Sequence, residues 1–225
     1  NPDEKQGAKE FDELLFKHIG HATKNTFGAF GAALTGSRFI KADMSGPTQH
    51  YYKEMTRLSR ALAVSADIAM ATLGGDLKRK EMISARLGDV LAYLYMSSAA
   101  LKKYEDEGRQ QQDLDYVHYA VQHCLYYAAQ SLQEAFTNYP QKAVGKLLKV
   151  IVFPLGNRYQ KPSDTLTVKL AESLMTPGAH RDRLTNLCYV GKREDDSVGL
   201  MEQAFIAMYG VKSLERKLMR AAKEG

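Results

Sequence analysis

Apolar residues recur along most of the chain at steps of three and four, which is the spacing of a helix with one buried face. A first run of this kind follows Ser45-Gly46-Pro47 and ends at Gly74-Gly75. A second extends from Asp76 to Gly108, and a third from about Asp113 to Asn138. Each run would form a helix about 40 Å long, given the rise per residue of an α-helix. The short connections between them predict antiparallel neighbours.

The run 76–108 is apolar on nearly every side, yet it carries Arg86 and Asp89 in its middle. A helix that is apolar all round is covered on several faces, so we expect this one at the centre of the bundle. A buried charge needs a partner. Asp67 lies in an apolar turn of the preceding helix and comes within reach of Arg86 if the two helices fold back at Gly74-Gly75. The sequence therefore predicts a network of Asp67, Arg86 and Asp89 that holds the bundle in register and has no catalytic role.

The other segments complete an all-α prediction: an antiparallel helical bundle of three to four long helices followed by several short helices. Residues 1–46 are expected to be a lead-in with one or two short helices, because four glycines interrupt the apolar spacing there. Residues 47–153 would form the bundle, with Ala143–Phe153 as its shorter fourth helix. Residues 154–225 would form short helices packed on the bundle, interrupted at Pro177 and Gly210.

Composition adds little to this picture. Hydrophobic residues make up 44% of the 225 and charged residues 25%, as in an ordinary globular protein. The sequence has no run of apolar residues long enough to cross a bilayer. The two cysteines, Cys124 and Cys188, show no paired spacing, and Cys124 falls on an apolar stripe. We therefore expect free thiols and a cytoplasmic environment.

The net charge of +5 is most concentrated in residues 141–161, which contain no acidic residue. Lys142, Lys146 and Lys149 share one face of the predicted helix there. Such a face is either simply solvated or a contact for an anionic surface, such as phospholipid headgroups or a phosphate-bearing ligand. No nucleic-acid-binding motif accompanies the charge, so nucleic acid is not an expected partner.

Residue patterns that carry catalysis or bind metals are missing from the sequence. His18 and His21 form a pair without further ligands at a recognisable spacing, so we expect no metal site. The glycines near Phe27 follow no strand and match no nucleotide-binding loop. We identify no catalytic residue.

The sequence resembles a known family in several ordered stretches that together cover nearly the whole chain. The stretches are FDELLFKHIGHATKNT (11–26), RLSRALAVSADIAMATLGG (57–75), the run from Leu73 to Arg109, VIVFPLGNRY (150–159), PSDTL (162–166), RDRLT (181–185) and VGLMEQA (198–204). On these stretches the chain is similar to the carboxy-terminal helical region of bacterial long-chain acyl-CoA dehydrogenases of fatty-acid β-oxidation. More distantly it resembles the carboxy-terminal domain of mitochondrial very-long-chain acyl-CoA dehydrogenase.

The resemblance implies a parent enzyme that uses FAD to introduce the α,β double bond into a fatty acyl-CoA and passes electrons to an electron-transfer flavoprotein. The family's catalytic glutamate and its flavin and CoA motifs lie in an upstream core. Nothing in this sequence matches them, so no catalytic or cofactor-binding residue is carried over. The expected role is a non-catalytic accessory domain for core packing, homodimer contacts or peripheral docking at the inner membrane. The alternative is an independent helical scaffold or interaction module.

Overall fold

The computed structural model describes residues 4–191 and 195–224, and every regular element in these ranges is a helix. The predicted all-α fold is confirmed. The chain divides into two compact units, residues 1–162 and 163–225. The division differs from the expected one, because residues 4–46 belong to the same unit as the long helices and so does the segment 154–162. Residues 1–3 of the expected lead-in lie outside the described part.

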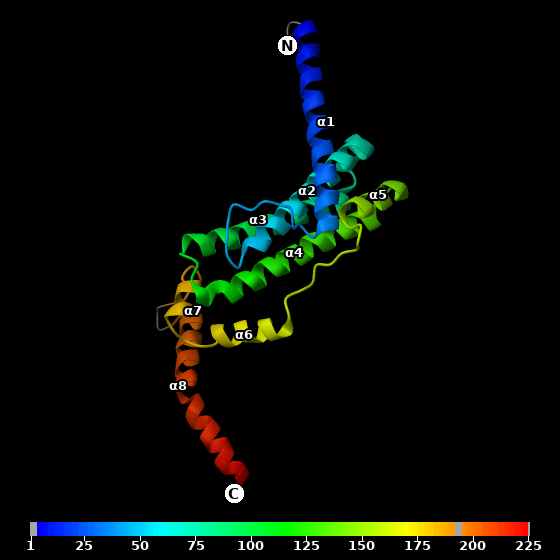
Figure 1. Cartoon of the computed structure of the whole chain (residues 1–225). Coiled ribbons are helices and arrows are strands. Elements are labelled where there is room, and N and C mark those ends of the chain that lie inside the picture. Colours follow the sequence, from blue (N-terminus) through cyan, green and yellow to red (C-terminus); the bar gives the residue numbers. More distant parts are fainter. Residues whose placement is uncertain (1–3, 192–194, 225) are drawn as a thin grey trace. The chain divides into compact units, whose positions relative to one another are not determined.

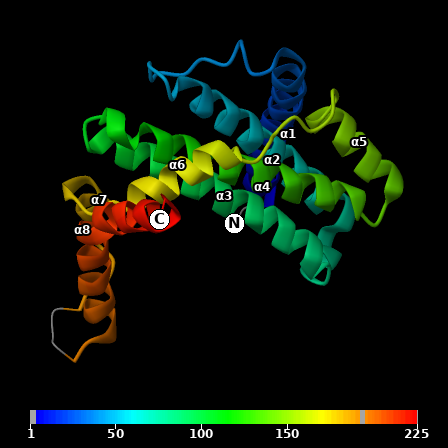
Figure 2. The same cartoon turned by 90° about the horizontal axis from the view of Figure 1, so that it is seen from below.

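In the first unit the long helices α2, α3 and α4 lie alongside one another, and α1 crosses them at a steep angle (Figures 1 and 2). Short connections join α2 to α3 and α3 to α4, as predicted for antiparallel neighbours. The elements are α1 (Glu4–Thr35), α2 (Gln49–Leu73), the 3-10 helix η1 (Gly74–Lys78), α3 (Glu81–Asp106), the 3-10 helix η2 (Gln111–Asp113), α4 (Leu114–Thr137) and α5 (Lys142–Val152).

The central helix is α4 and not α3. Helix α4 packs against α3, α2 and α5, and its side chains at Val121, Ala128 and Leu132 are completely buried. Helix α3 buries only one stripe, which includes Val90 and Leu101, and leaves its other side open. Helix α3 packs against α4 and α2, but its outer side is exposed, so the prediction that α3 lies at the centre of the bundle is wrong for this chain.

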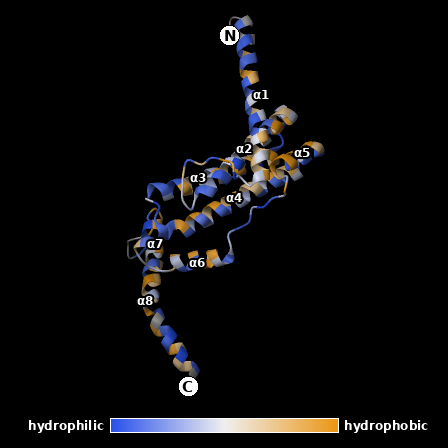
Figure 3. Ribbon diagram, viewed as in Figure 1, coloured by the Kyte–Doolittle hydropathy of each residue, from blue (hydrophilic) through white to orange (hydrophobic). Residues whose placement is uncertain are grey.

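Helix α1 is continuous, which corrects the expected one or two short helices. A single glycine costs a helix only about 1 kcal/mol relative to alanine, so packing can outweigh it. At Gly28 the absence of a side chain also allows close packing, because a Cβ there would lie 3.1 Å from Nη1 of Arg60 on α2. The carboxy-terminal part of α1 packs against α2 and α5, and apolar residues concentrate where α1, α4 and α5 meet (Figure 3).

A buried polar cluster fastens the segment after α5 to α2. Arg57, whose side chain is almost fully buried, forms an ion pair with Glu54 at 3.6 Å and lies over the ring of Tyr159 at 5.4 Å. The Tyr159 hydroxyl donates a hydrogen bond to Glu54 Oε2. Burial raises the pKa of Tyr159 well above its ordinary value, so the hydroxyl keeps its proton and remains a donor.

The second unit contains α6 (Asp164–Leu174), α7 (Ala179–Leu184) and α8 (Ser197–Glu224). Ser163 caps α6 by accepting a hydrogen bond from the Leu166 backbone at 3.2 Å. Arg181 of α7 forms two hydrogen bonds with Glu202 of α8, at 2.6 and 2.8 Å, and lies over the Phe205 ring at 4.9 Å.

The predicted interruption at Gly210 is wrong, because α8 continues through it. One exposed glycine costs a helix only about 1 kcal/mol, which the remaining residues of this long helix outweigh.

A partly buried hydrogen-bonded chain links α2 to α4. Gln122 Nε2 donates to the Tyr51 hydroxyl at 3.0 Å, and this hydroxyl lies 2.7 Å from Nδ1 of His118. The Tyr51 hydroxyl therefore accepts from Gln122, while the donor of its bond with Nδ1 depends on the tautomer of the imidazole. Burial, followed by the neighbouring imidazole of His50, lowers the pKa of His118 below 6.5, while Asp115 opposes this in part.

The lowered pKa of His118 predicts a loss of stability in acid. Above pH 6.5 the imidazole is neutral in both states, and below it the unfolded chain takes up a proton that the folded chain resists. The free energy of unfolding should fall from pH 6.5 towards the folded pKa, by less than about 1.4 kcal/mol per pH unit from this group. Urea unfolding of His118→Gln should lack this part of the slope. His21→Gln, at an exposed position of α1, is the control and should keep the wild-type slope.

Candidate functional site

The first unit has an open cleft of about 920 Å³ where α2, the carboxy-terminal half of α3 and the segment before α2 meet. An adjoining hollow of about 510 Å³ shares Met44 and Tyr52 with it and reaches Leu91 and Leu94. The floor of the cleft is apolar and its rim is charged. Its lining residues are Met44, Tyr52, Tyr95, Ser98, Ala99, Lys102, Lys103, Glu105, Asp106 and Glu107.

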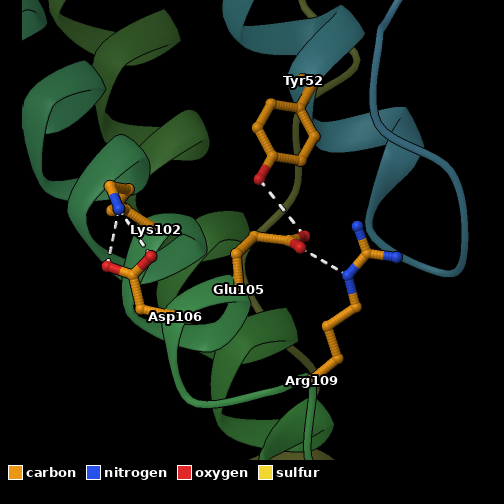
Figure 4. Close-up of polar contacts among 5 residues, drawn as sticks. All are labelled: Tyr52, Lys102, Glu105, Asp106 and Arg109. Carbon is orange, nitrogen blue, oxygen red and sulfur yellow. Dashed lines mark hydrogen bonds and ion pairs between the residues drawn. The ribbon is translucent and has the colours of Figure 1, made fainter.

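The carboxylate of Glu105 is the centre of the polar contacts in this cleft (Figure 4). It forms an ion pair with Arg109 Nε and accepts a hydrogen bond from the Tyr52 hydroxyl at 3.5 Å. Arg109 Nη1 also donates to the backbone oxygen of Ser45 at 3.3 Å. These contacts join the end of α3 to α2 and to the segment before α2. We call the contacts of Tyr52, Glu105 and Arg109 the latch, because they hold these three parts of the chain together.

The backbone after α3 gives the latch its geometry. Gly108 and Arg109 both have positive φ, at 80° and 55°, so the chain turns sharply where α3 ends. A non-glycine residue with positive φ is uncommon, and it persists only where surrounding contacts hold it. Here the contacts are those of Arg109 with Glu105 and Ser45. Burial, followed by the charge of Glu105, raises the pKa of Tyr52, so its hydroxyl stays protonated as a donor.

The charged groups on the rim neutralise one another. Lys102 donates to both oxygens of Asp106, at 2.5 and 2.7 Å, and Lys103 forms an ion pair with Glu107. With Arg109 paired to Glu105, each cation of the rim already has a carboxylate. Neither FAD nor CoA fits such a set, because their phosphates need unpaired donors or a glycine-rich backbone cradle. The cleft offers an apolar floor and no group poised for proton or hydride transfer.

This floor continues along the outer side of α3. Leu91 and Tyr95 are exposed by 62% and 73%, and small residues surround them. A Cβ on Gly88 would meet nothing within 4 Å. From Ser84 to Ala99 the outer side is uncharged except for Asp89 at its edge, and its exposed members are Ser84, Ala85, Gly88, Leu91, Ala92, Tyr95, Met96 and Ala99. We call these residues the outer face of α3.

The predicted network of Asp67, Arg86 and Asp89 does not form. Arg86 Nε lies 3.5 Å from Glu134 Oε2 on α4, Asp67 lies 3.7 Å from Nε2 of His18 on α1, and Asp89 is exposed. The prediction treated Gly74-Gly75 as the whole turn, whereas η1 and two further residues separate α2 from α3. They shift the register of the two helices, and α4 supplies the carboxylate instead.

The basic face of α5 is present as the spacing indicated. Lys142 and Lys146 are exposed and Lys149 is half-buried. Leu147 and Val150, exposed by 53% and 58%, lie directly beside this basic face on α5. The opposite side of α5 is buried against α4, where a Cβ on Gly145 would lie 2.3 Å from the Phe136 carbonyl oxygen.

Sequence reasoning missed the latch of Tyr52, Glu105 and Arg109. One signal was available, because Glu105 and Arg109 stand four residues apart, the spacing of a helical ion pair. The predicted end of the helix at Gly108 already placed Arg109 beyond α3, but nothing in the sequence showed that Tyr52 of another helix faces the same carboxylate.

A family model described as "Acyl-CoA dehydrogenase, C-terminal, bacterial type" matches residues 1–225. The chain belongs to this family. The match confirms the resemblance found in the sequence, and the predicted fold class agrees with it. No solved structure matches the chain.

Within residues 4–191 and 195–224 no three histidine, cysteine or acidic side chains gather in a way that could hold a metal ion. None of the helices described in these ranges is both long and apolar enough to cross a membrane. Cys124 is buried and Cys188 exposed, and both are free thiols.

The latch predicts that the charge of Glu105 contributes to stability. Glu105→Gln keeps the shape but removes the charge facing Arg109, which is itself partly exposed, so the free energy of unfolding should fall by about 1 kcal/mol. Asp106→Asn removes an exposed pair on the same helix and should cost less than about 0.5 kcal/mol. Urea unfolding of both variants measures the difference. Equal effects of the two substitutions would contradict the role of the latch.

Proposed function

We propose that this chain is a non-catalytic accessory domain of an FAD-dependent acyl-CoA dehydrogenase of fatty-acid β-oxidation, and that it packs against the catalytic core of its own chain through the outer face of α3. On this proposal the flavin, the base that removes the α-proton and the transfer of electrons to an electron-transfer flavoprotein belong to the core. The single observation that carries the proposal is the exposed outer face of α3 in a chain that belongs to this family.

The outer face is unusual for a surface left in water. Isolated exposed apolar residues are common, but contiguous ones mark contacts with other proteins. Leu91, Tyr95 and Met96 supply the bulk, and each fully covered side chain of this size contributes about 1.5–3 kcal/mol. Gly88, Ala92 and Ala99 let a second surface approach the backbone of α3 closely. The contrast between the buried and the open side of α3 thus supports the proposal that another part of the enzyme packs against the open side.

The self-paired rim of the cleft supports the non-catalytic part of the proposal. A general acid or base needs access to substrate and a free lone pair or proton. Glu105 is held by Arg109 and Tyr52, and the rim lysines are held by carboxylates of their own helix. These groups organise the domain and leave the chemistry to another part of the enzyme.

An arginine on the outer face should separate the domain from the core without unfolding it. Gly88→Arg places a bulky cation where the domain itself has open space, so the 225-residue chain should melt as the wild type does. In the full-length enzyme the domain should be released by limited proteolysis at least tenfold faster, because the cation cannot enter an apolar contact. Gly20→Arg on α1, another open helical glycine, is the matched control. Wild-type proteolysis of the Gly88→Arg enzyme would contradict the proposal.

A second function, docking on an anionic membrane surface, is favoured by a separate observation on α5. Lys142, Lys146 and Lys149 carry positive charge directly beside the exposed Leu147 and Val150. Basic side chains attract acidic headgroups, and neighbouring apolar side chains enter the boundary between headgroups and acyl chains. A merely solvated basic face needs no exposed leucine beside it. This contact would hold the enzyme at the inner face of a membrane that contains its lipid-derived substrates.

Charge reversal on α5 tests this docking. The triple substitution of Lys142, Lys146 and Lys149 by glutamate should reduce co-sedimentation with phosphatidylserine-containing vesicles roughly hundredfold, since each basic residue near such a surface contributes about 1 kcal/mol. High salt should weaken wild-type binding as well. The matched control reverses Lys78, Arg79 and Lys80, which are exposed at the turn before α3. An equal loss in the control would mean that net charge, and not the α5 face, governs binding.

A further inference from the structure

Helix α8 carries an apolar seam that the rest of its unit does not use. The seam has strict steps of four and three residues over Leu200, Ala204, Ala207, Val211, Leu214 and Leu218, and all six are exposed. Alternating steps of this kind repeat every seven residues, as in helices that pair side by side along a narrow line. Apolar residues recur along α8 in Figure 3.

The contacts of α8 inside its own unit lie on the opposite side of the helix. Glu202 and Phe205 contact Arg181 of α7, and Tyr209 and Lys212 line a hollow shared with α6. In an α-helix with 3.6 residues per turn, these positions face away from the seam. The second unit therefore holds α8 by one side and presents the seam on the other.

We propose that the α8 seam pairs with the α8 seam of a second copy of this chain in an antiparallel arrangement. A seam of identical sequence is complementary to itself about a two-fold axis, which makes a second copy a suitable occupant. Antiparallel packing places Leu200 opposite Leu218, Ala204 opposite Leu214, and Ala207 opposite Val211. The alanines face larger residues, so the two helices interlock at a close and even distance.

Charge decides the orientation. The carboxy-terminal half of α8 carries Lys212, Arg216, Lys217, Arg220 and Lys223 against Glu215 among its described side chains. The amino-terminal half carries only Glu202. Parallel pairing would place two basic halves side by side, whereas antiparallel pairing separates them and also opposes the two helix dipoles.

A membrane is the main competing occupant, because an amphipathic helix with basic residues can lie on a lipid surface. Glu215 argues against it. On a helical wheel this carboxylate falls inside the apolar sector, between Ala204 and Met208, so that burying the sector in lipid would bury the charge. In a helix pair the same position flanks the seam and stays in water. The inference goes beyond the proposed function and does not depend on the outer face of α3.

Cysteine cross-linking in the full-length protein tests both the pairing and its direction. In a Cys188→Ser background, Leu200→Cys and Leu218→Cys chains are produced separately and co-expressed, then mildly oxidised. Antiparallel pairing predicts at least five times more disulfide-linked dimer from the co-expressed chains than from either alone. Parallel pairing would instead link each variant to itself and would overturn the proposal, as would no cross-link at all.

Matched substitutions then ask whether the seam itself forms the pair. Leu214→Gln should reduce the cross-linked yield more than tenfold, whereas Ile206→Gln, equally exposed but outside the seam, should leave it unchanged. A yield that Leu214→Gln does not change overturns the proposal. So does an absent cross-link together with phosphatidylserine-vesicle binding that Leu214→Gln abolishes, because this result assigns the seam to a membrane. Since Gly88→Arg tests α3 separately, failure here leaves the accessory role standing.

Discussion

The burial of α4 on several sides is the constraint on which the first unit depends. Val121, Ala128 and Leu132 are inaccessible to solvent, and α2, α3 and α5 all pack against this helix. Small side chains at Ala128 and Ala129 let neighbours approach closely, and interiors packed at this density tolerate little change in volume. Because α4 occupies the centre, α3 is left on the outside with only one stripe covered. The exposed outer face of α3 is a direct consequence.

The polar groups of the first unit follow a second rule on α2 and at the end of α3, where charged side chains are neutralised locally. Arg57 has Glu54 and the ring of Tyr159, Glu105 has Arg109 and Tyr52, and the rim lysines have carboxylates one turn away. Such clusters fix register but leave no charge ready to bind phosphate or to move a proton. The exposed surface of the domain includes apolar side chains on α1, α3 and α8 and a basic face on α5.

The helices were predictable because the spacing of apolar residues in each one reflects which side of that helix is buried. The apolar runs that form α2 and α4, and the helix predicted at Ala143–Phe153, all match the structure within a few residues. The predictions failed where the outcome depended on a second element. Arg86 pairs with Glu134 and not with Asp67, because the turn between α2 and α3 is longer than the sequence indicated. Gly28 and Gly210 were interpreted as breaks, although close packing at Arg60 explains the first and an uninterrupted helix includes the second.

The same limitation explains why α3 was placed at the centre. A helix that is apolar all round must be covered on several sides, but periodicity does not say which molecule covers it. Within this chain α4 covers one side of α3, and the remaining side, with Gly88 and Tyr95, is open. The inference from sequence placed α3 at the centre of the bundle, whereas α4 takes that place within this chain. The proposed contact with a catalytic core would supply the cover that this side of α3 lacks within the chain.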